Sequence, residues 1–461
     1  MKIDCKLDRS PNVNHDDVLA YFFEQYANSP EPISVDFRSL VSASPYGERG
    51  ATHLIHTYPA KLLMHIPHFF ISSNLLSRPS DLVLDPFCGS GTVLLESILS
   101  GRDAIGADSN PLARLIARVK TTCVEASKLK AGLAELLLKI PLTVSTPLPN
   151  VVNIDYWFHE KVITQLHRIL EAINEVNDEE IKNFFLVCFS NCIKKVSLAD
   201  LNVSVPVRLK VGHYPEDHRL HKQGVARLEK LKNIDVIQEF TKIANENIKR
   251  NSHLSDAFPV NCRVHNVFSD SRELFCDKIN FKQPNNSVQL IVTSPPYAGA
   301  QKYIRSSSLS LGWLGLCDDS SLREFEKLNI GREHYAKHEY SQLHTSGLDE
   351  ADRLLQDIFK ENPLRSHIAA NYLTEMRTAF TEMVRVLKSG GYLVLVVANN
   401  QVCGREFKTQ EYLKAIVESL GLTLKLRLID DIHSRGLMTK RNKTASLISC
   451  EWVLVFQKPE V

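Results

Sequence analysis

The segment of residues 81–117 constrains the fold more than any other part of the chain. Its sequence, DLVLDPFCGSGTVLLESILSGRDAIGADSNPLARLIA, reads as a strand, a glycine-containing turn and a helix, followed by a second strand, turn and helix. A strand that passes through a helix to the next strand is the unit of a parallel sheet, which needs helices on both of its faces. This segment therefore predicts an α/β fold.

The rest of the chain continues this alternation. Further strand-like segments are CRVHNVF, VQLIVT, YLVLVVANN, TLKLRLIDD and CEWVLVFQK, and helical patterns at residues 372–387 and 411–422 separate three of them. Together these segments predict a doubly wound, mostly parallel, seven-stranded Rossmann-like sheet. Upstream, HTYPAKLLMHIPHFFISSNLL is a candidate amphipathic helix that opens at Pro59. Residues 124–260, between the second and third strands, show mainly the 3.6-residue apolar period of helices and predict a helical insertion.

Composition narrows the class of protein. With 461 residues, 44% of them hydrophobic and 23% charged, the chain is expected to be a soluble globular protein. No apolar run approaches the roughly 20 residues that span a bilayer, and the first residues lack the apolar core of a signal peptide. We therefore expect a cytoplasmic protein with no membrane partner. The formal net charge of +2 leaves nucleic-acid binding open, because basic residues can gather on one face.

No metal site is predicted. The ten cysteines include no CxxC pair, and Cys188 and Cys192, four residues apart in an apolar helical stretch, are expected to be core thiols. The pairs His53/His56 and His65/His68 have a spacing that could hold a metal, but neither has a Cys or acidic companion at ligand spacing.

The turn after the first strand places Gly89 and Gly91 before an apolar helix. Glycines let the backbone approach a ligand, and a helix N-terminus offers free N–H groups. By itself this pattern would serve any nucleotide, or be a tight turn without a ligand. The turn lacks the GxGxxG form of dinucleotide-binding folds and the GK[ST] of a P-loop, so a bound phosphate is not expected.

Two acids at strand ends sharpen this prediction. Asp85 ends the first strand, where a carboxylate suits an ammonium group or an organising network. Asp108 ends the second strand about 20 residues on, where an acid can accept both hydroxyls of a ribose. A ribose without a phosphate clamp, beside an acid that suits an amine, indicates S-adenosylmethionine.

The strand VQLIVT runs directly into Ser294-Pro295-Pro296-Tyr297. Consecutive prolines end the strand and stiffen the backbone after it, and the carboxyl edge of an open α/β sheet is where ligands bind. A proline-rich ligand for another protein is the alternative, but such ligands lie in exposed polar segments, whereas this tetrad follows apolar strand residues. We therefore expect the tetrad and the glycine turn to face each other across one site.

These motifs resemble those of a known family. DPFCGSGT together with GADSNP resembles the cofactor motifs of the DNA amino-methyltransferases (cytosine-N4 and adenine-N6), and TSPPY resembles their catalytic motif. HTYPAKL is similar to the family's segment beside the methionine end of the cofactor. VFSDSREL falls where the family has an acid near the adenine, and VLKSGGYLVLVV resembles its fifth-strand region. The long helical insertion departs from the family's pattern.

The resemblance implies S-adenosyl-L-methionine as the cofactor, and it assigns residues to two roles. Those assigned to the cofactor are Tyr58, Lys61, Asp85, Pro86, Phe87, Gly89, Gly91, Thr92, Asp108, Ser109, Asp270 and Thr293. Those assigned to catalysis are Ser294, Pro295, Pro296 and Tyr297. The implied division is 1–123 for the N-terminal segment and cofactor-binding half, 124–260 for the insertion as a candidate DNA-recognition region, and 261–461 for the catalytic half, with a possible DNA-contacting insertion at 298–370.

The tetrad suits methylation of an exocyclic base amine, whose lone pair is delocalised into the ring. Ser294 can accept one hydrogen bond from the amine and the carbonyl of Pro295 another. Tyr297 offers a flat face for a base extruded from the duplex. The amine would attack the sulfonium methyl in line, without a covalent adduct. Methylation of carbon 5 of cytosine would need the Pro-Cys motif of that enzyme family, and this chain has no Pro-Cys dipeptide.

Serine at the first tetrad position resembles the cytosine-N4 group, whereas asparagine or aspartate is commoner among adenine-N6 enzymes. The resemblance thus favours N4 of cytosine in double-stranded DNA, in a restriction–modification or orphan modification system with a possible cognate restriction endonuclease. Three alternatives stay open: an adenine-N6 enzyme, an RNA enzyme acting on the N2 amine of guanine, and a catalytically silent DNA-binding protein of the same fold. The sequence indicates no oligomeric state.

Three basic stretches have the composition to contact DNA, although each can also be an ordinary solvated loop. The first carries Lys194, Lys195, Arg208, Lys210, Arg219 and Lys222 near Tyr214. The second, AQKYIRSSS, carries Lys302, Tyr303 and Arg305 and continues into NIGREHYAKHEYSQLH. The third is HSRGLMTKRNKTASL, near the end of the chain.

Overall fold

A computed structural model of the chain describes residues 14–41, 52–59, 61–140, 146–257, 262–299, 303–317, 321–431 and 450–460. Its centre is a sheet with the strand order β1-β11-β12-β8-β7-β2-β3-β4. The strands are β1 (Ile33–Ser34), β2 (Leu82–Asp85), β3 (Asp103–Ala107), β4 (Val264–Phe268), β7 (Val288–Thr293), β8 (Leu387–Val397), β11 (Thr423–Asp431) and β12 (Cys450–Gln457). Only β12 runs antiparallel to its neighbours. The mostly parallel sheet is confirmed; all seven predicted strands form, and the two-residue β1 extends the edge.

Helices cover both faces of the sheet, so the fold is doubly wound as predicted. Val83 and Leu84, neighbours in β2, belong to different buried clusters because successive strand residues point to opposite faces. One cluster includes α1 (His15–Asn28), α2 (Phe37–Leu40), α3 (His65–Ser72) and part of α4 (Thr92–Leu99). The other includes α14 (Asp349–Glu361), α15 (Pro363–Val386) and α16 (Thr409–Ser419). Two-stranded pairs β5 (Phe275–Cys276) with β6 (Phe281–Lys282), and β9 (Asn400–Val402) with β10 (Arg405–Phe407), lie outside this sheet.

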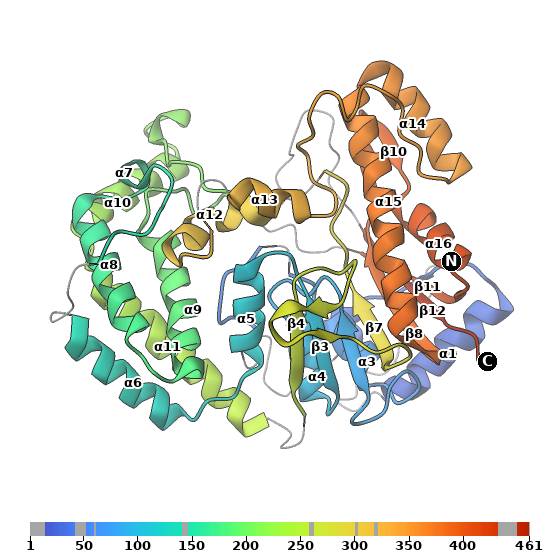
Figure 1. The fold of residues 1–461 in the computed structure, drawn as a ribbon, viewed down its shortest axis with the longest axis horizontal. Helices are drawn as coiled ribbons and strands as arrows, with labels where there is room; N and C mark the ends of the chain where they lie inside the picture. The colour runs from blue at the N-terminus through green and yellow to red at the C-terminus, as the bar shows by residue number, and fades with distance from the viewer. Residues whose placement is uncertain are drawn as a thin grey trace.

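The predicted helical insertion gathers at one side of the molecule, beside α5 (Pro111–Thr121) and β4 at the sheet edge (Figure 1). Its helices are α6 (Ala126–Lys139), α7 (Ile154–Trp157), α8 (Glu160–Asn174), α9 (Glu179–Val196), α10 (Arg219–Lys232) and α11 (Val236–Ala257). None of the helices in the described part of the chain is long and apolar enough to cross a membrane.

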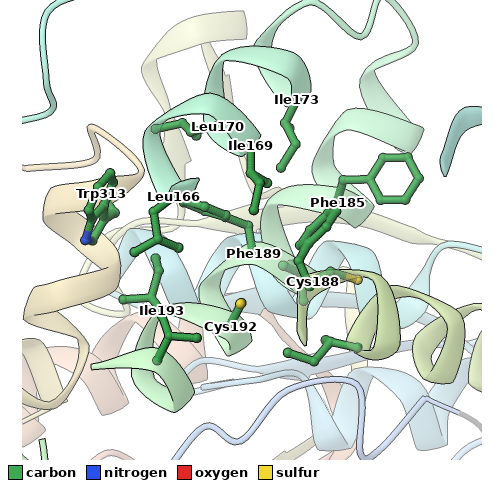
Figure 2. Packing of buried hydrophobic residues seen from close by; sticks show 14 of the residues in the cluster. Leu166, Ile169, Leu170, Ile173, Phe185, Cys188, Phe189, Cys192, Ile193 and Trp313 are labelled. Carbon is green, nitrogen blue, oxygen red and sulfur yellow. The ribbon is translucent and has the colours of Figure 1, made fainter. Parts of the chain in front are cut away.

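The insertion has a hydrophobic core of its own, but the core is not built from the insertion alone. Cys188 and Cys192 of α9 are fully buried in it, as expected for core thiols (Figure 2). Trp313 enters from α12 (Tyr303–Trp313) and places its ring edge-on to Phe158 and Phe189, with centroids 5.8 and 6.1 Å away. The boundary proposed at residues 260 and 261 lies outside the described residues. We keep the three-part division as a proposal, with α12 fastened to the insertion.

One helix prediction needs correction. The helix expected to open at Pro59 begins only at His65. A helix from Pro59 would put Pro67 in its interior, where the proline ring meets the carbonyl of Leu63; in α3, Pro67 lies in the first turn, which tolerates it. Within the insertion, α10 and α11 are separate helices, because the carboxylate of Asp235 accepts hydrogen bonds from the backbone N–H groups of Ile237 and Gln238 and starts a new helix.

Replacing Trp313 with alanine tests how firmly α12 is fastened to the insertion. The side chain is fully buried, so the variant should lose about 3–5 kcal/mol of unfolding free energy, as large-to-small core substitutions do. Urea denaturation measures this loss. Leu138→Ala, which truncates a side chain that is 74% exposed on α6, should stay within about 0.5 kcal/mol of the parent. Equal losses in both variants would contradict the shared core.

Candidate active site

The turn between β2 and α4 needs glycine for two physical reasons. Gly89 and Gly91 have φ angles of +48° and +77°, in the left-handed region that L side chains rarely adopt. A Cβ on Gly91 would also come within 3.0 Å of the Cα and Cβ of Ala117, where α4 packs against α5. The backbone N–H of Gly89 donates to Oδ2 of Asp108 at 3.0 Å. The turn is thereby joined to the end of β3.

Asp108 lies half-buried between this turn and the start of α5. Its Oδ1 accepts a hydrogen bond from the backbone N–H of Asn110 at 2.8 Å. Burial raises the pKa of Asp108 to about 6, although these backbone hydrogen bonds oppose the shift. Each carboxylate oxygen has one backbone donor and keeps a lone pair for another, so the side chain can accept further hydrogen bonds from a ligand.

Asp85 joins the ends of two neighbouring parallel strands. Its Oδ1 accepts hydrogen bonds from the hydroxyl of Thr293 at 2.7 Å and from the backbone N–H of Phe87 at 3.1 Å. Both side chains are buried, and burial raises the pKa of Asp85 to about 7. Of the two uses predicted for this carboxylate, the geometry matches the organising network.

The glycine turn and the tetrad form two walls of one pocket. The predicted site residues that line it are Tyr58, Pro86, Phe87, Gly89, Asp108, Ser109, Asp270, Ser294 and Pro296. Residues that sequence reasoning did not assign to the site complete the lining: Ser271, Tyr303, Leu328, Asn329 and Ile330. Segments about 200 positions apart in the chain therefore meet at the carboxyl edge of the sheet, because β2 and β7 are adjacent strands.

The other predicted site residues lie outside the lining, and their assigned roles stay predictions. They are Lys61, Asp85, Gly91, Thr92, Thr293, Pro295 and Tyr297. The ammonium of Lys61 donates to the carbonyls of His53 and His56, at 3.0 and 2.6 Å, and so fastens the preceding segment. Thr92 begins α4 and is buried. Burial raises the pKa of the Tyr297 phenol well above its ordinary value, and the nearby carboxylate of Glu451 is the second largest cause of this shift.

Asp270 reaches the pocket as half of an ion pair. Its two carboxylate oxygens accept hydrogen bonds from Nε and Nη2 of Arg272, at 2.9 and 2.8 Å. A second contact, from Nη1 of Arg272 to Glu375 at 3.3 Å, fixes the guanidinium from the other side. The pair holds the Asp270 carboxylate in one orientation beside the pocket.

Asn110 connects parts of the site in a way that the sequence did not indicate. Its amide donates to the phenol oxygen of Tyr58 at 3.2 Å and to the hydroxyl of Ser307 at 3.0 Å, so it ties the N-terminal segment to α12. The hydroxyl of Ser109 donates to Asn329 at 2.7 Å across the pocket. Ser271 adjoins a predicted residue and Tyr303 lay in a predicted DNA-contacting stretch. Leu328 lies outside the three predicted basic stretches, whereas Asn329 and Ile330 open the stretch NIGREHYAKHEYSQLH, which was predicted to contact DNA and not to line the pocket.

The candidate metal-spaced histidines serve a buried carboxylate behind the turn. His53 and His68 contact the two oxygens of Glu96 at 2.5 and 2.9 Å. Burial alone would raise the pKa of Glu96, but these hydrogen bonds outweigh it and hold the pKa at about 2. Among the described residues, no cluster of three or more His, Cys, Asp and Glu side chains is placed to hold a metal ion.

Several of the basic side chains predicted to contact DNA make hydrogen bonds or ion pairs within the protein. Arg208 donates to the carbonyl of Tyr156 and lies 4.7 Å from the centre of its ring, and Lys194 donates to the carbonyl of Val203 at 3.0 Å. Lys195 pairs with Glu239 at 3.3 Å. Side chains that are exposed and without an internal partner in the described part of the chain are Lys210, Arg219, Lys222 and Arg305. Lys302 and the loop 433–447 lie outside the described residues.

Comparison with known proteins finds similar DNA methyltransferases. A family model described as DNA methylase, covering N6 and N4 types, matches residues 38–118. The type II methyltransferase M.MvaI of Kocuria varians is 27% identical over 376 residues, covering 76% of this chain and 77% of the relative. M.BsoBI of Geobacillus stearothermophilus is 22% identical over 383 residues, covering 74% and 73%. M.MjaII of Methanocaldococcus jannaschii is 36% identical over 87 residues, 19% of this chain and 16% of that protein.

The fold and the site define an α/β enzyme class with a ligand pocket at the carboxyl edge of the sheet. Together with these matches, they support a DNA amino-methyltransferase family for the chain, with the N4 and N6 types not distinguished.

The close packing at Gly91 can be tested against a matched glycine. Gly91 and Gly101 share a φ of +77°, but a Cβ on Gly101 would meet nothing within 4 Å. Gly101→Ala should therefore lose only the backbone strain of about 1–2 kcal/mol. Gly91→Ala should lose more, because the methyl group forces α4 away from α5, and its affinity for S-adenosylmethionine should fall at least tenfold. Denaturation and calorimetric titration measure both effects, and equal behaviour of the two variants would refute the role of the contact.

Asp85 should give the protein a specific pH dependence. Its folded-state pKa of about 7 lies above its ordinary value of 3.8, so its contribution to stability is full below about pH 3.8 and lost as the pH rises through about 7. Asp85→Asn does not titrate. Between about pH 4 and pH 8, the unfolding free energy of the parent should therefore fall relative to this variant, by up to about 4 kcal/mol. Asp349→Asn, on the exposed start of α14, should run parallel to the parent. Denaturation at each pH measures the difference, and parallel curves for Asp85→Asn would overturn the assignment.

Proposed function

We propose that this protein transfers a methyl group from S-adenosylmethionine to the exocyclic amine of a base flipped out of double-stranded DNA, and that the amine is N4 of cytosine. One observation carries the proposal: Gly89 of the glycine turn and Asp108 line the same pocket as Ser294 and Pro296 of the tetrad. A cofactor held at one wall can therefore meet a base held at the other.

The charge of the pocket suits this cofactor. Asp108 and Asp270 are among the described residues that line it, and neither lysine nor arginine is. Such a lining disfavours a phosphate and favours a ligand with positive charge, as S-adenosylmethionine has on its sulfonium and ammonium groups. Asp108 has lone pairs for two ribose hydroxyls, and Phe87, Leu328 and Ile330 offer apolar surface for an adenine. When bound, the cofactor supplies an electrophilic methyl group.

The protein's own residues would make the amine nucleophilic. The hydroxyl of Ser294, at the pocket, accepts a hydrogen bond from the amine, and the carbonyl of Pro295, stiffened by the following proline, accepts a second. These bonds draw electron density toward the nitrogen and favour its pyramidal form. Thr293 precedes Ser294 and is anchored on Asp85 at 2.7 Å, which fixes the start of the tetrad. Tyr297 would stack on the extruded base.

DNA as the substrate is supported by the relatives. They are named type II methyltransferases, and two of them align over about three quarters of this chain. We extend that activity to this protein, in a modification system that acts alone or with a cognate endonuclease. Serine at the first position of the tetrad supports cytosine over adenine.

Product analysis tests the proposal. The purified chain, labelled S-adenosylmethionine and amplified, unmethylated DNA or transcribed RNA are incubated, and the products are digested to nucleosides for mass spectrometry. N4-methylcytosine from DNA is the expected result. 6-Methyladenine would overturn the choice of base, and N2-methylguanosine from RNA alone would overturn the choice of nucleic acid.

A serine variant tests the chemistry. Ser294→Ala removes one hydrogen-bond acceptor for the amine, so kcat should fall about a hundredfold or more while cofactor affinity stays within about twofold. Thr381→Ala, which removes an exposed hydroxyl that donates to the carbonyl of Arg377 within α15, is the control and should keep full activity. Full methylation by Ser294→Ala, measured by transfer of labelled methyl, would refute the role of the tetrad.

A further inference from the structure

A second hollow lies directly beside the candidate catalytic pocket. It has a volume of about 530 Å³ and is formed by the start of α12, by α13 (Ser321–Leu328) and by the segment that follows α13. Tyr303 and Asn329 line both spaces, so they form a common wall. Figure 1 shows α13 between the helical insertion and α15, above the edge of the sheet. A polymer that enters the catalytic pocket can continue past this wall into the hollow.

The hollow carries cationic side chains, whereas the charged side chains of the pocket are acidic. Four of its lining residues are cationic, Arg305, Arg323, Lys327 and Arg332, whereas the described lining of the pocket has none. The pocket is acidic and the hollow on the other side of the wall is basic. Such a pair suits a ligand that is neutral or cationic where it faces the cofactor and anionic in the part that follows. A nucleotide strand beside a sulfonium cofactor has this arrangement.

Internal pairing leaves two of these cations available. Lys327 pairs with Glu324 at 2.8 Å, and Arg332 lies 3.8 Å from Glu339 and donates to the carbonyl of Lys327. Arg305 and Arg323 are exposed, and neither guanidinium has an internal partner in the part of the chain that the structure describes.

Two of the three carboxylates that line the hollow are paired with arginines. Glu333 contacts Arg365 at 3.3 Å, and Glu339 faces Arg332. Glu326 is the remaining acidic residue of the lining, so two unpaired arginines stand against one carboxylate. One guanidinium group can donate two parallel hydrogen bonds to two oxygens of a phosphate, so arginine is well suited to bind a phosphate here.

The floor of the hollow offers a flat surface as well. The guanidinium of Arg332 lies 4.4 Å from the centre of the Tyr335 ring, and Nε of Arg332 is buried without a hydrogen-bond partner. The phenol oxygen of Tyr335 accepts a hydrogen bond from Asn371 at 2.7 Å, which holds the ring in place. Planar arginine and tyrosine surfaces are those on which unstacked bases lie.

We propose that this hollow holds the nucleotide next to the target base in the same DNA strand, with its phosphate bound by Arg305 and Arg323 and its base against the Arg332–Tyr335 surface. The proposal rests on the proposed function. Gripping the strand on one side of the flipped base would keep the duplex open while the amine stays in the pocket. Arg305 and Arg323 thus act as positioning residues that bind substrate without touching the reacting atoms.

The test uses the full chain with both arginines replaced. Arg305→Ala/Arg323→Ala should raise KM for amplified, unmethylated duplex DNA about tenfold at 0.15 M salt, with kcat and the affinity for S-adenosylmethionine within about twofold of the parent. The slope of log binding constant against log salt should become less steep by about 2, one unit for each lost phosphate contact. Arg305→Lys/Arg323→Lys keeps the charges, so its salt slope should match that of the parent.

Arg78→Ala/Lys425→Ala is the matched control. It removes the same two charges from exposed positions just before β2 and near the start of β11, outside the hollow and outside the candidate DNA-contacting regions, and should change neither KM nor the salt slope. Circular dichroism and thermal melting identify a folding defect in any variant.

Two outcomes overturn the inference. An unchanged salt slope in the Arg305→Ala/Arg323→Ala variant would show that the arginines do not contact phosphate. An equal change in the salt slope of Arg78→Ala/Lys425→Ala would show that the effect comes from net charge alone. Failure of the proposed function is distinguishable, because the parent protein itself would then leave DNA unmethylated.

Discussion

The hydrogen bond between Thr293 and Asp85 holds together the ends of the two strands on which the site is built. Adjacent parallel strands β2 and β7 end side by side, and the 2.7 Å bond crosses between them where both side chains are buried. A buried carboxyl costs free energy unless it is hydrogen-bonded or neutral, and this one has a pKa raised to about 7. The turn that follows Asp85 and the tetrad that follows Thr293 therefore start from one fixed point and open toward the same space.

The helical insertion contributes to the site indirectly, because its core anchors α12. Its core takes in Trp313 from α12, and α12 supplies Tyr303 to the pocket and Ser307 to the amide of Asn110. Packing in the insertion thus reaches the wall between the candidate catalytic pocket and the hollow beside it. In the proposed function, packing in the insertion would therefore bear on where the substrate strand lies.

Much of the sheet could be predicted because its strands are locally distinctive. Runs such as VQLIVT and YLVLVVANN are apolar enough to be buried on both faces, and turn residues bound them. Helix boundaries were harder. The pattern at Pro59 has helical spacing, yet Pro67 prevents a helix from running through it. Among site residues, those next to a motif, such as Gly89 and Asp108, were within reach of sequence reasoning.

By itself, the sequence determined the order of strands and helices, the glycine turn, the acids at the strand ends and the tetrad, because each depends on neighbouring residues and on local backbone geometry. Only the tertiary structure decided which of these residues line the pocket, that Lys61 and Asp85 hydrogen-bond to neighbouring groups of the chain, and that Leu328, Asn329 and Ile330 close the far wall. The physical reason is that a pocket is formed by side chains from distant segments, and their meeting depends on strand pairing and helix packing that no local pattern records.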